Sequence, residues 1–557
     1  MDRRAFLRYG AAAGAAAAAA AHGVPDLAGA QSARADRETG SSRPGTRPRG
    51  FEPTQFELEE MPIEELRRAM ESGRHTARSI VETYLERIAA LDRRGPTLRH
   101  VLETNPDALA IADRLDRERR EDGPRGPLHG IPVVVKDNID TGDRMLTTAG
   151  SLALEGAPAP RDAFLIERLR AAGAIILAKT NLSEWANFRS TQSSSGWSAR
   201  GGQGRNPYAL DRTPCGSSSG TGGAVSASYA AAGIGTETDG SVVCPSSANG
   251  IVGVKPTVGL VSRSGIVPIA HSQDTAGVMA RTVTDAATVL GALTGVDPRD
   301  PATRTSQGNT HRDYTRFLDP DGLRGARIGV ARAQFFGYST EADAIVEDAI
   351  AAMRDAGATV VDPADIPHAG EYDDGEFTVL LYEFRNDLNE YLATREGVAV
   401  RSLADVIDFN ERNRAREMPY FGQEIMHMAQ EKGPLTEREY RDTLARNHRL
   451  SRDEGIDAAM DGHRLDALVA PTGSPPWPID LINGDHFLGA SSTPAAVAGY
   501  PIVAVPAGES FGLPVAISFI GRAWSEPTLL RLAYAFEQAT NVRRPPRFPP
   551  TAELSVT

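Results

Sequence analysis

The segment 214–257 constrains the fold of this chain more than any other, because it is rich in glycine and serine. Glycine permits positive φ and lets the backbone approach a ligand closely. The N–H groups of such a loop can surround an anion or a developing oxyanion. Apolar residues at 224–232 and 251–254 interrupt the glycines, as the elements of a core would. The pattern therefore favours a folded site, with a flexible linker as the alternative.

The overall composition is typical of a soluble globular protein. The chain has 557 residues, of which 41% are hydrophobic and 24% are charged. This length allows one large domain or two to four smaller ones. A net charge of −13 argues against a nucleic-acid partner. No apolar run of 18 or more residues lies outside the N-terminus, so we expect no internal transmembrane helix and no stable membrane anchor.

The N-terminal residues 1–30 have the pattern of a twin-arginine export signal. They contain R-R-A-F-L at 3–7, an alanine-rich stretch at 11–21 and a small-residue cleavage pattern, A-G-A, at their end. We therefore expect the twin-arginine export machinery to be a partner and the protein to be exported, to the periplasm or the extracellular space. An ordinary disordered tail is the alternative. Residues 31–52 are rich in Arg, Ser, Gly and Pro, which predicts a disordered spacer.

Alternating strand and helix patterns predict an α/β fold. The apolar run within 130–138 is typical of a buried strand, and Lys136 stands at its C-terminal end. Sheets of this class place ligands at such strand ends. A helical pattern at 164–171 and a second apolar run at 174–178 complete a β–α–β unit.

The same rhythm returns at 328–361 and 467–521, so the first and last parts of the chain are expected to share one sheet. Residues 375–460 have helical periodicity and many charges, which predicts a peripheral helical cap. We expect one folded domain over 53–545 and a tail at 546–557.

Lysine is rare in this chain, and its rarity marks a candidate base. Arginine stays protonated, whereas a buried lysine can lose its proton. To act as a base near neutral pH, a lysine must have its pKa lowered from ~10.4 by ~3 units, which burial can supply. Lys136 at the end of an apolar strand meets this demand, and a second hydroxyl could relay the proton of a serine nucleophile to this amine. The four lysines among 60 basic residues are Lys136, Lys179, Lys255 and Lys432.

A Ser–His–acid triad is the competing arrangement. Residues 216–220 match G-x-S-x-G with Ser218 in the nucleophile position. The segment 206–214 before them is polar and contains prolines, where that motif requires a strand. The eleven histidines are scattered and form no H-E-x-x-H or Cys/His ligand set, so we expect no metal and no cofactor. The late histidines that such a triad would need have no recognisable context: His427, His448, His463 and His486.

Two features near the glycine-rich segment leave alternatives open. Cys215 and Cys244 are the only cysteines, and buried free thiols are favoured over one bridge between them. Trp185, Phe188 and Trp197 could line a substrate cleft or anchor loops.

Several motifs together resemble those of the amidase signature family, over about residues 55–540. The resemblance implies an α/β fold in a single large domain, with a central mixed β-sheet covered by helices. Within the family, E-W-A-N-F-R-S-T at 184–191 and S-G-W-S-A-R-G-G-Q at 195–203 are similar to bacterial peptide amidases. The family motifs are P-V-V-V-K-D-N at 132–138, G-S-S-S-G at 216–220, G-T-E-T-D-G-S at 235–241, G-V-K-P-T at 253–257 and L-P-V-A-I-S-F-I-G at 513–521.

The resemblance implies a Ser–cis-Ser–Lys triad. By motif position, Ser241 is the nucleophile, Ser217 bridges from a cis peptide, and Lys136 is the base. Ser218 is expected to support Ser217. The oxyanion hole is expected to consist of the backbone N–H groups of Thr238, Asp239, Gly240 and Ser241.

The chain departs from the family pattern at three positions of the nucleophile loop. Most members carry Asp, Gly and Arg where this chain has Glu237, Asp239 and Val243, so the common ion pair across the loop is absent. The extra carboxyl of Asp239 is expected to disfavour acidic substrates or to hold an amine.

Four charged residues outside this loop are expected to support the site. Asp274 and Arg281 are expected to pair in the site wall. Lys179 and Lys255 are expected to hold loops through backbone carbonyls.

The resemblance predicts a serine amide hydrolase that works through an acyl-enzyme and releases ammonia from C-terminal peptide amides. Its expected partner is therefore a small-molecule or peptide amide substrate. A general aryl or aliphatic amidase of the same family is the alternative. An α/β-hydrolase-type esterase and an inactive binding protein are more remote. An amidotransferase subunit is disfavoured, because an exported protein would not meet charged tRNA.

Overall fold

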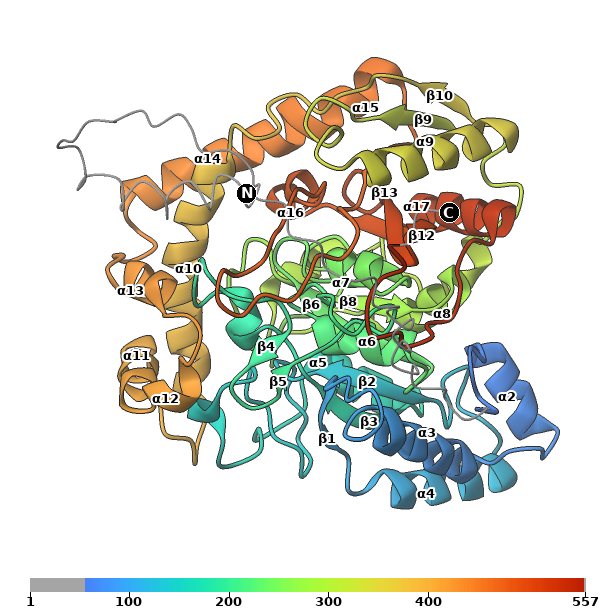
Figure 1. The fold of residues 1–557 in the computed structure, drawn as a ribbon, viewed down its shortest axis with the longest axis vertical. Coiled ribbons are helices and arrows are strands. Elements are labelled where there is room, and N and C mark those ends of the chain that lie inside the picture. Colours follow the sequence, from blue (N-terminus) through green and yellow to red (C-terminus); the bar gives the residue numbers. More distant parts are fainter. Residues whose placement is uncertain (1–55, 555–557) are drawn as a thin grey trace, which may run out of the picture.

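An 11-stranded mixed sheet runs through the middle of the described chain, residues 56–554 of a computed structural model (Figure 1). In spatial order its strands are β1 (Val101–Thr104), β3 (Ile175–Thr180), β2 (Pro132–Lys136), β6 (Ala232–Glu237), β8 (Thr275–Ala280), β7 (Val252–Lys255), β12 (Ile502–Ser510), β13 (Leu513–Ile520), β11 (Ala467–Pro471), β9 (Arg327–Val330) and β10 (Thr359–Val361). β2 is parallel to β3 and β6, whereas β7 and β12 are antiparallel and join the early strands to the late ones. The predicted single mixed sheet shared by both ends of the chain is confirmed.

Strand β12 shows how the sequence builds two layers on this sheet. Successive side chains of a strand point to opposite faces. Val503 and Val505 therefore join one hydrophobic cluster, and Ile502 and Ala504 join another. The first cluster includes side chains of α8 (Val283–Leu293), α9 (Thr340–Asp355) and α17 (Glu526–Thr540), and the second includes α7 (Val243–Ala248), α15 (Asp457–His463) and α16 (Thr493–Ala498).

The early helices extend the first cluster beside β1 to β3. Thr76 begins α3 with a capping box, in which its hydroxyl accepts from Ser79 N–H and Ser79 Oγ accepts from Thr76 N–H. These helices are α2 (Ile63–Glu71), α3 (Ala77–Leu91), α4 (Ala108–Glu121) and α5 (Phe164–Ala171), and a two-stranded ribbon of β4 (Trp197–Ser198) and β5 (Gly202–Gln203) lies apart from the main sheet.

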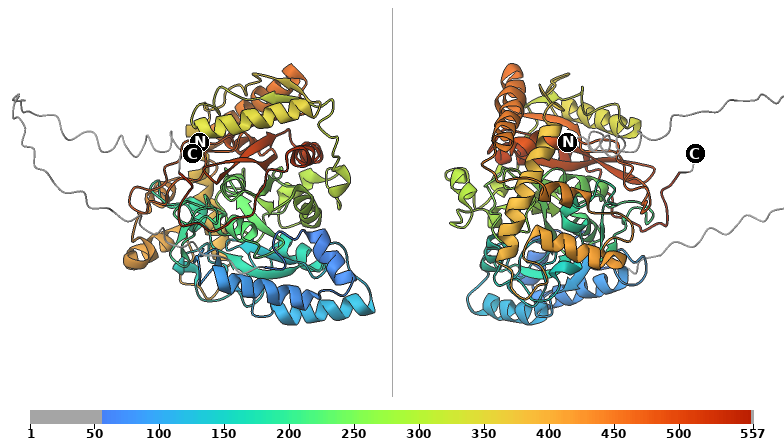
Figure 2. Two further views of the ribbon diagram at one scale, coloured as in Figure 1. Left: turned by 45° about the vertical axis from the view of Figure 1, so that its right-hand side comes forward. Right: turned by 90° about the vertical axis from the view of Figure 1, so that its left-hand side faces the viewer.

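The predicted helical cap covers one side of the molecule (Figures 1 and 2). Apolar side chains of three cap helices pack with Trp185, Phe188 and Ile269 in a separate hydrophobic cluster. The cap therefore rests on segments that surround the glycine-rich region. Its helices are α10 (Asp373–Ala393), α11 (Leu403–Arg412), α12 (Arg414–Glu417), α13 (Glu424–Gln430) and α14 (Arg438–Ser451), followed by a π-helical turn at Arg452–Ile456 and by α15.

Two predictions concern N-terminal residues that the structure does not describe. The predicted export signal at 1–30 and the predicted spacer at 31–52 lie outside the described residues. From residue 56 to residue 554, each helix is too short or too polar to cross a bilayer.

The predicted tail at 546–557 packs on the domain as far as it is described. Phe548 is buried and donates its N–H to Pro207 O at 3.0 Å. Pro549 O accepts from Leu210 N–H at 2.9 Å. The folded unit therefore continues past the boundary at 545 that the sequence predicted.

Part of the glycine-rich segment forms a helix, α6 (Ser219–Ser226), that is buried along its whole length. Glycine is unfavourable in a helix, and no helix was predicted here. The neighbours explain the glycines: a Cβ built at Gly223 would lie 1.9 Å from His100 Nε2, and one at Gly220 would lie 2.4 Å from Asn181 O. Small residues thus let α6 pack directly against polar groups of the sheet.

This packing predicts opposite effects for two Gly→Ala changes in helices. Gly223→Ala should lower the free energy of unfolding by about 2 kcal/mol or more, because the added methyl overpacks the contact with His100. A Cβ at Gly462 in α15 would meet no atom within 4 Å, so Gly462→Ala should raise the free energy of unfolding by up to about 1 kcal/mol. Urea unfolding of both variants measures this. Equal stability of the two variants would show that α6 does not need glycine.

Candidate active site

Strand β2 delivers Lys136 into the interior, where its side chain is fully buried. Its Nζ lies 2.7 Å from Ser217 Oγ, 2.8 Å from Thr236 Oγ1 and 3.2 Å from Thr236 O. Asn138 Nδ2 donates to the same Thr236 hydroxyl at 2.9 Å. Sequence reasoning missed Thr236, although its place in the G-T-E-T-D-G-S motif was a signal for it.

Burial decides the charge of Lys136. Loss of solvation lowers the pKa of Lys136 to about 7, and the carboxylates of Asp274 and Glu237 only partly oppose this. Near neutral pH the amine is therefore uncharged in a large fraction of molecules. An uncharged amine can accept a proton from the hydroxyl of Ser217.

The segment that carries Ser217 is tied to the loop after β3 and to strand β6. The Gly216–Ser217 peptide is cis, and Ser217 O accepts from Ser183 N–H at 3.0 Å. Ser218 Oγ donates to Thr236 O at 3.0 Å and accepts from Thr236 N–H at 3.2 Å. Because these backbone groups occupy the Ser218 hydroxyl, the arrangement fits a supporting role for Ser218 rather than a nucleophile of a Ser–His–acid triad.

The loop between β6 and α7 presents Ser241 to the cleft. Gly240 has φ of +75°, which a glycine adopts without strain, and Cys244 N–H bonds back to Gly240 O at 2.8 Å. Within residues 56–554, the N–H groups of Thr238, Gly240 and Ser241 donate no hydrogen bond to another residue. This loop can therefore donate to an oxyanion beside Ser241.

The backbone links the segments that carry Ser217 and Ser241, but the two hydroxyls form no hydrogen bond with each other. Ser218 N–H donates to Ser241 O at 3.1 Å, which joins the two backbone segments. The hydroxyl of Ser241 bonds to no described residue, Ser217 included. Hydrogen bonds of catalytic groups often form only in the complex with substrate, so the arrangement still permits a Ser241–Ser217–Lys136 relay.

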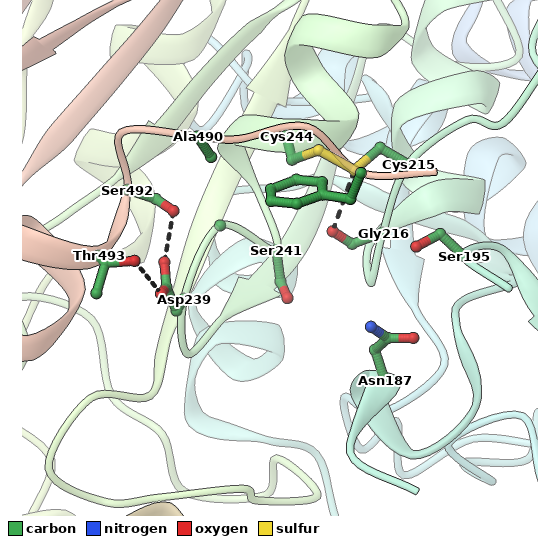
Figure 3. A pocket seen from close by; sticks show the side chains of 12 residues that line it. Asn187, Ser195, Cys215, Gly216, Asp239, Ser241, Cys244, Ala490, Ser492 and Thr493 are labelled. Carbon is green, nitrogen blue, oxygen red and sulfur yellow. Dashed lines mark hydrogen bonds between the residues drawn. A yellow bond between two sulfur atoms is a disulfide. The ribbon is translucent and has the colours of Figure 1, made fainter. Parts of the chain in front are cut away.

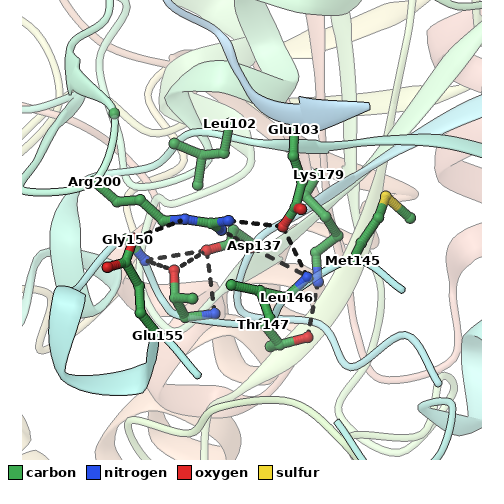
Figure 4. A network of polar contacts seen from close by, with 12 residues as sticks. Leu102, Glu103, Asp137, Met145, Leu146, Thr147, Gly150, Glu155, Lys179 and Arg200 are labelled. Atoms are coloured by element: carbon green, nitrogen blue, oxygen red, sulfur yellow. Dashed lines mark hydrogen bonds and ion pairs between the residues drawn. The ribbon is translucent and has the colours of Figure 1, made fainter. Parts of the chain in front are cut away.

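A polar network surrounds Asp137, the residue that follows β2 (Figure 4). Asp137 accepts from Thr148 N–H at 3.2 Å and from Gly150 N–H at 3.3 Å. Its other oxygen lies 3.5 Å from Arg200 Nη1 and 3.8 Å from Lys179 Nζ. Adjacent strand residues point to opposite faces, so this carboxylate pairs with other cations while Lys136 faces the hydroxyls.

Lys179 and Lys255 hold backbone carbonyls, as predicted. Lys179 Nζ donates to Ile139 O at 2.5 Å, and Lys255 Nζ donates to Tyr500 O at 2.7 Å. Glu237, where the family usually has Asp, accepts from the N–H groups of Val242 and Val243 at 2.7 and 3.0 Å. It thereby holds the start of α7, directly after Ser241.

The predicted pairing of Asp274 with Arg281 is wrong, because the two residues lie at opposite ends of β8. Asp274 accepts from Thr238 Oγ1 at 2.5 Å and from Ile269 N–H at 2.8 Å, so it does support the nucleophile loop. Arg281 instead donates to the carbonyls of Val225, Ala230 and Met61 at the far side of the sheet.

The two cysteines form a disulfide, which corrects the preference for free thiols (Figure 3). Their Cα atoms are 6.0 Å apart although 29 positions separate them in the sequence. The chain returns along β6 between them, which a linear sequence does not reveal. The bridge joins the residue before the cis peptide to α7, and so ties the Ser217 segment to the segment after Ser241.

Two adjoining pockets share Asn187, Asp239 and Ser241 in their walls. Figure 3 shows the pocket bordered by the disulfide, with Asp239 accepting from Ser492 Oγ at 2.5 Å and from Thr493 Oγ1 at 2.7 Å. The other pocket lies towards α10. We refer to the two together as the cleft.

The sequence left open whether three aromatic residues line a cleft or anchor loops, and the structure places them differently. Phe188 lines the pocket towards α10, whereas Trp185 is buried under the cap. Trp197 packs edge-on against Phe421, with ring centroids 5.1 Å apart, and lines neither pocket of the cleft. One of the three therefore reaches the cleft, and the other two anchor loops.

One group of described residues has the spacing of metal ligands, namely His271, Glu383 and Asp387. His271 Nδ1 lies 2.9 Å from Asp387 Oδ2, and Tyr440 donates to Glu383 Oε1 at 2.7 Å. Burial opposes a charged His271, but its bond to Asp387 and the charge of Glu383 raise its pKa to about 9. The group thus contains its own cation, and it links the loop that carries Asp274 to α10.

Comparisons with known proteins agree with this geometry. The amidase family model matches residues 79–530. A probable amidase of Arabidopsis thaliana is 44% identical over 502 residues, which is 88% of this chain and 92% of the relative. The structure of the native peptide amidase from Stenotrophomonas maltophilia is 52% identical, has a TM-score of 0.85 and covers 89% of this chain and 100% of its own. A peptide amidase in complex with the competitive inhibitor chymostatin is also 52% identical, with a TM-score of 0.86 and coverage of 88% and 100%. The chain therefore belongs to the amidase signature family and is a hydrolase that acts on amide C–N bonds.

Proposed function

We propose that this enzyme removes ammonia from C-terminal amides of peptides through an acyl-enzyme on Ser241. The observation that carries the chemistry is the contact of 2.7 Å between a buried, largely uncharged Lys136 and Ser217 Oγ, beside the Ser241 loop. The peptide preference is supported by the 52% identity to peptide amidases. A general amidase that prefers aryl or aliphatic amides is the competing hypothesis.

In the proposed first step, Lys136 takes the proton of Ser217 while Ser217 takes that of Ser241. Ser241 Oγ then attacks the carbonyl carbon of the amide. The backbone N–H groups of Thr238, Asp239, Gly240 and Ser241 stabilise the oxyanion.

In the second step the relay runs in reverse. The proton on Lys136 passes through Ser217 to the amide nitrogen, the C–N bond breaks and ammonia leaves. Water, deprotonated by the same relay, attacks the ester on Ser241 and releases the carboxylate. The relay lets one amine serve as base and then, as an ammonium, as acid.

A panel of amides tests the substrate class and the roles of the residues. The wild type should release ammonia from an N-acetylated dipeptide amide with a higher kcat/KM than from benzamide. Ser241→Ala and Lys136→Ala should each lower kcat by about 10³-fold or more, because the triad acts as a unit. Lys432→Ala, a lysine of the cap, is the matched control and should retain activity. Full activity of Ser241→Ala would exclude the mechanism, and faster hydrolysis of benzamide would favour the competing hypothesis.

The lowered pKa of Lys136 predicts the acid limb of the pH profile. The active form is the neutral amine, so kcat/KM for an uncharged amide should rise about tenfold per pH unit below pH 7 and level off above it. The negative charge of Asp274 raises the pKa of Lys136, so Asp274→Asn should move this limb to lower pH. A limb near pH 4 that Asp274→Asn leaves in place would point to a carboxylate base instead.

A further inference from the structure

The pocket of the cleft towards α10 combines apolar walls with carboxylates. Its walls include Phe188, Ile269, Phe377 and Leu380, and its volume is about 130 Å³. Among the described residues, the ionisable side chains that line the whole cleft are Asp239 and Glu376, and no lysine, arginine or histidine lines it. Burial raises the pKa of Glu376 to about 7, so above that pH a ligand in this pocket meets hydrocarbon and negative charge together.

Glu376 lies close to the reacting loop. It is buried in α10, and its Oε1 accepts from Gln273 Nε2 at 2.8 Å. The same Gln273 nitrogen lies 3.4 Å from Thr238 O, on the loop that ends in Ser241. The Gln273 side chain thus lies between the Glu376 carboxylate and the backbone of the loop that carries Ser241.

Asp239 brings a second carboxylate to the same cleft. Its oxygens accept from the hydroxyls of Ser492 and Thr493 at 2.5 and 2.7 Å, and these bonds fix the direction of the carboxylate. These bonds hold the carboxylate at the wall of the cleft.

We propose that Glu376 and Asp239 make this enzyme select amides that carry a cationic group near the scissile bond. The inference rests on the proposed amide hydrolysis and names its substrate class. A C-terminal lysine amide fits best, because its aliphatic stem can lie on Phe377 and Leu380 while its ammonium reaches Glu376. An amide with a carboxylate at the same position is repelled by both acids.

Three N-acetylated amides of matched size test the selectivity, with lysine, norleucine or glutamate as the residue that carries the amide. The wild type should hydrolyse the lysine amide with a kcat/KM at least about tenfold above that of norleucine amide, and the glutamate amide should be slowest. Glu376→Gln keeps the shape of the side chain and should remove most of the lysine preference. Glu390→Gln, on the exposed face of α10 and outside the cleft, should leave the preference unchanged.

Two further experiments distinguish an α-ammonium from a side-chain ammonium, and a failure of the proposed reaction from a failure of the charge selectivity. A comparison of Gly-norleucine amide with its N-acetyl form shows whether the enzyme also selects an α-ammonium. The Asp239→Asn variant shows whether Asp239 or Glu376 binds the cation. Calorimetric binding of the lysine and norleucine amides to Ser241→Ala measures the preference without turnover. If no amide releases ammonia but the lysine amide binds more tightly, the proposed reaction fails and the charge selectivity stands. Equal kcat/KM and equal binding for lysine and norleucine amides would overturn the inference.

Discussion

The structure of the site depends on a lysine that is buried without a carboxylate in contact. Lys136 is fully enclosed, and its Nζ bonds are to hydroxyl and carbonyl oxygens. An ammonium in such a place is costly, and the cheapest response is loss of its proton. Lys179 shows the alternative. It is equally buried, but its Nζ lies 3.8 Å from the carboxylate of Asp137, whose negative charge favours the ammonium form. Two lysines at the ends of adjacent strands thus have different roles because of the groups that face them.

Three separate segments must meet for this amine to act on a substrate. The end of β2 supplies Lys136, the segment before α6 supplies Ser217, and the loop before α7 supplies Ser241. The glycines of α6 allow it to pack tightly against the sheet, and the disulfide joins the second segment to the third. Such a bridge is typical of proteins in oxidising compartments, which supports the proposed export of this chain.

Much of this arrangement could be predicted from the sequence, because it follows from apolar runs and motif order. The run before Lys136 identified a buried strand, and the return of the same pattern after residue 467 placed the last strands in the same sheet. The expectation that Lys179 and Lys255 hold backbone carbonyls was also correct.

Features that depend on distance between remote residues could not be predicted. The short strand β1 has only four residues and no clear alternation, and α6 was hidden by its glycines. The disulfide and the separation of Asp274 from Arg281 depend on the length and direction of β6 and β8, which the motifs do not encode. The carboxylate of Glu376 enters the cleft from the cap, a region in which no motif drew attention to single residues.

The rarity of lysine makes the central claim directly measurable. With four lysines in the chain, selective ¹³C labelling of the side chains gives few signals, and Lys136→Met identifies the one of interest. The account predicts that this signal titrates near pH 7, far below an ordinary lysine. A titration of the same signal above pH 9 would show that the amine stays charged at neutral pH, and it would contradict the account.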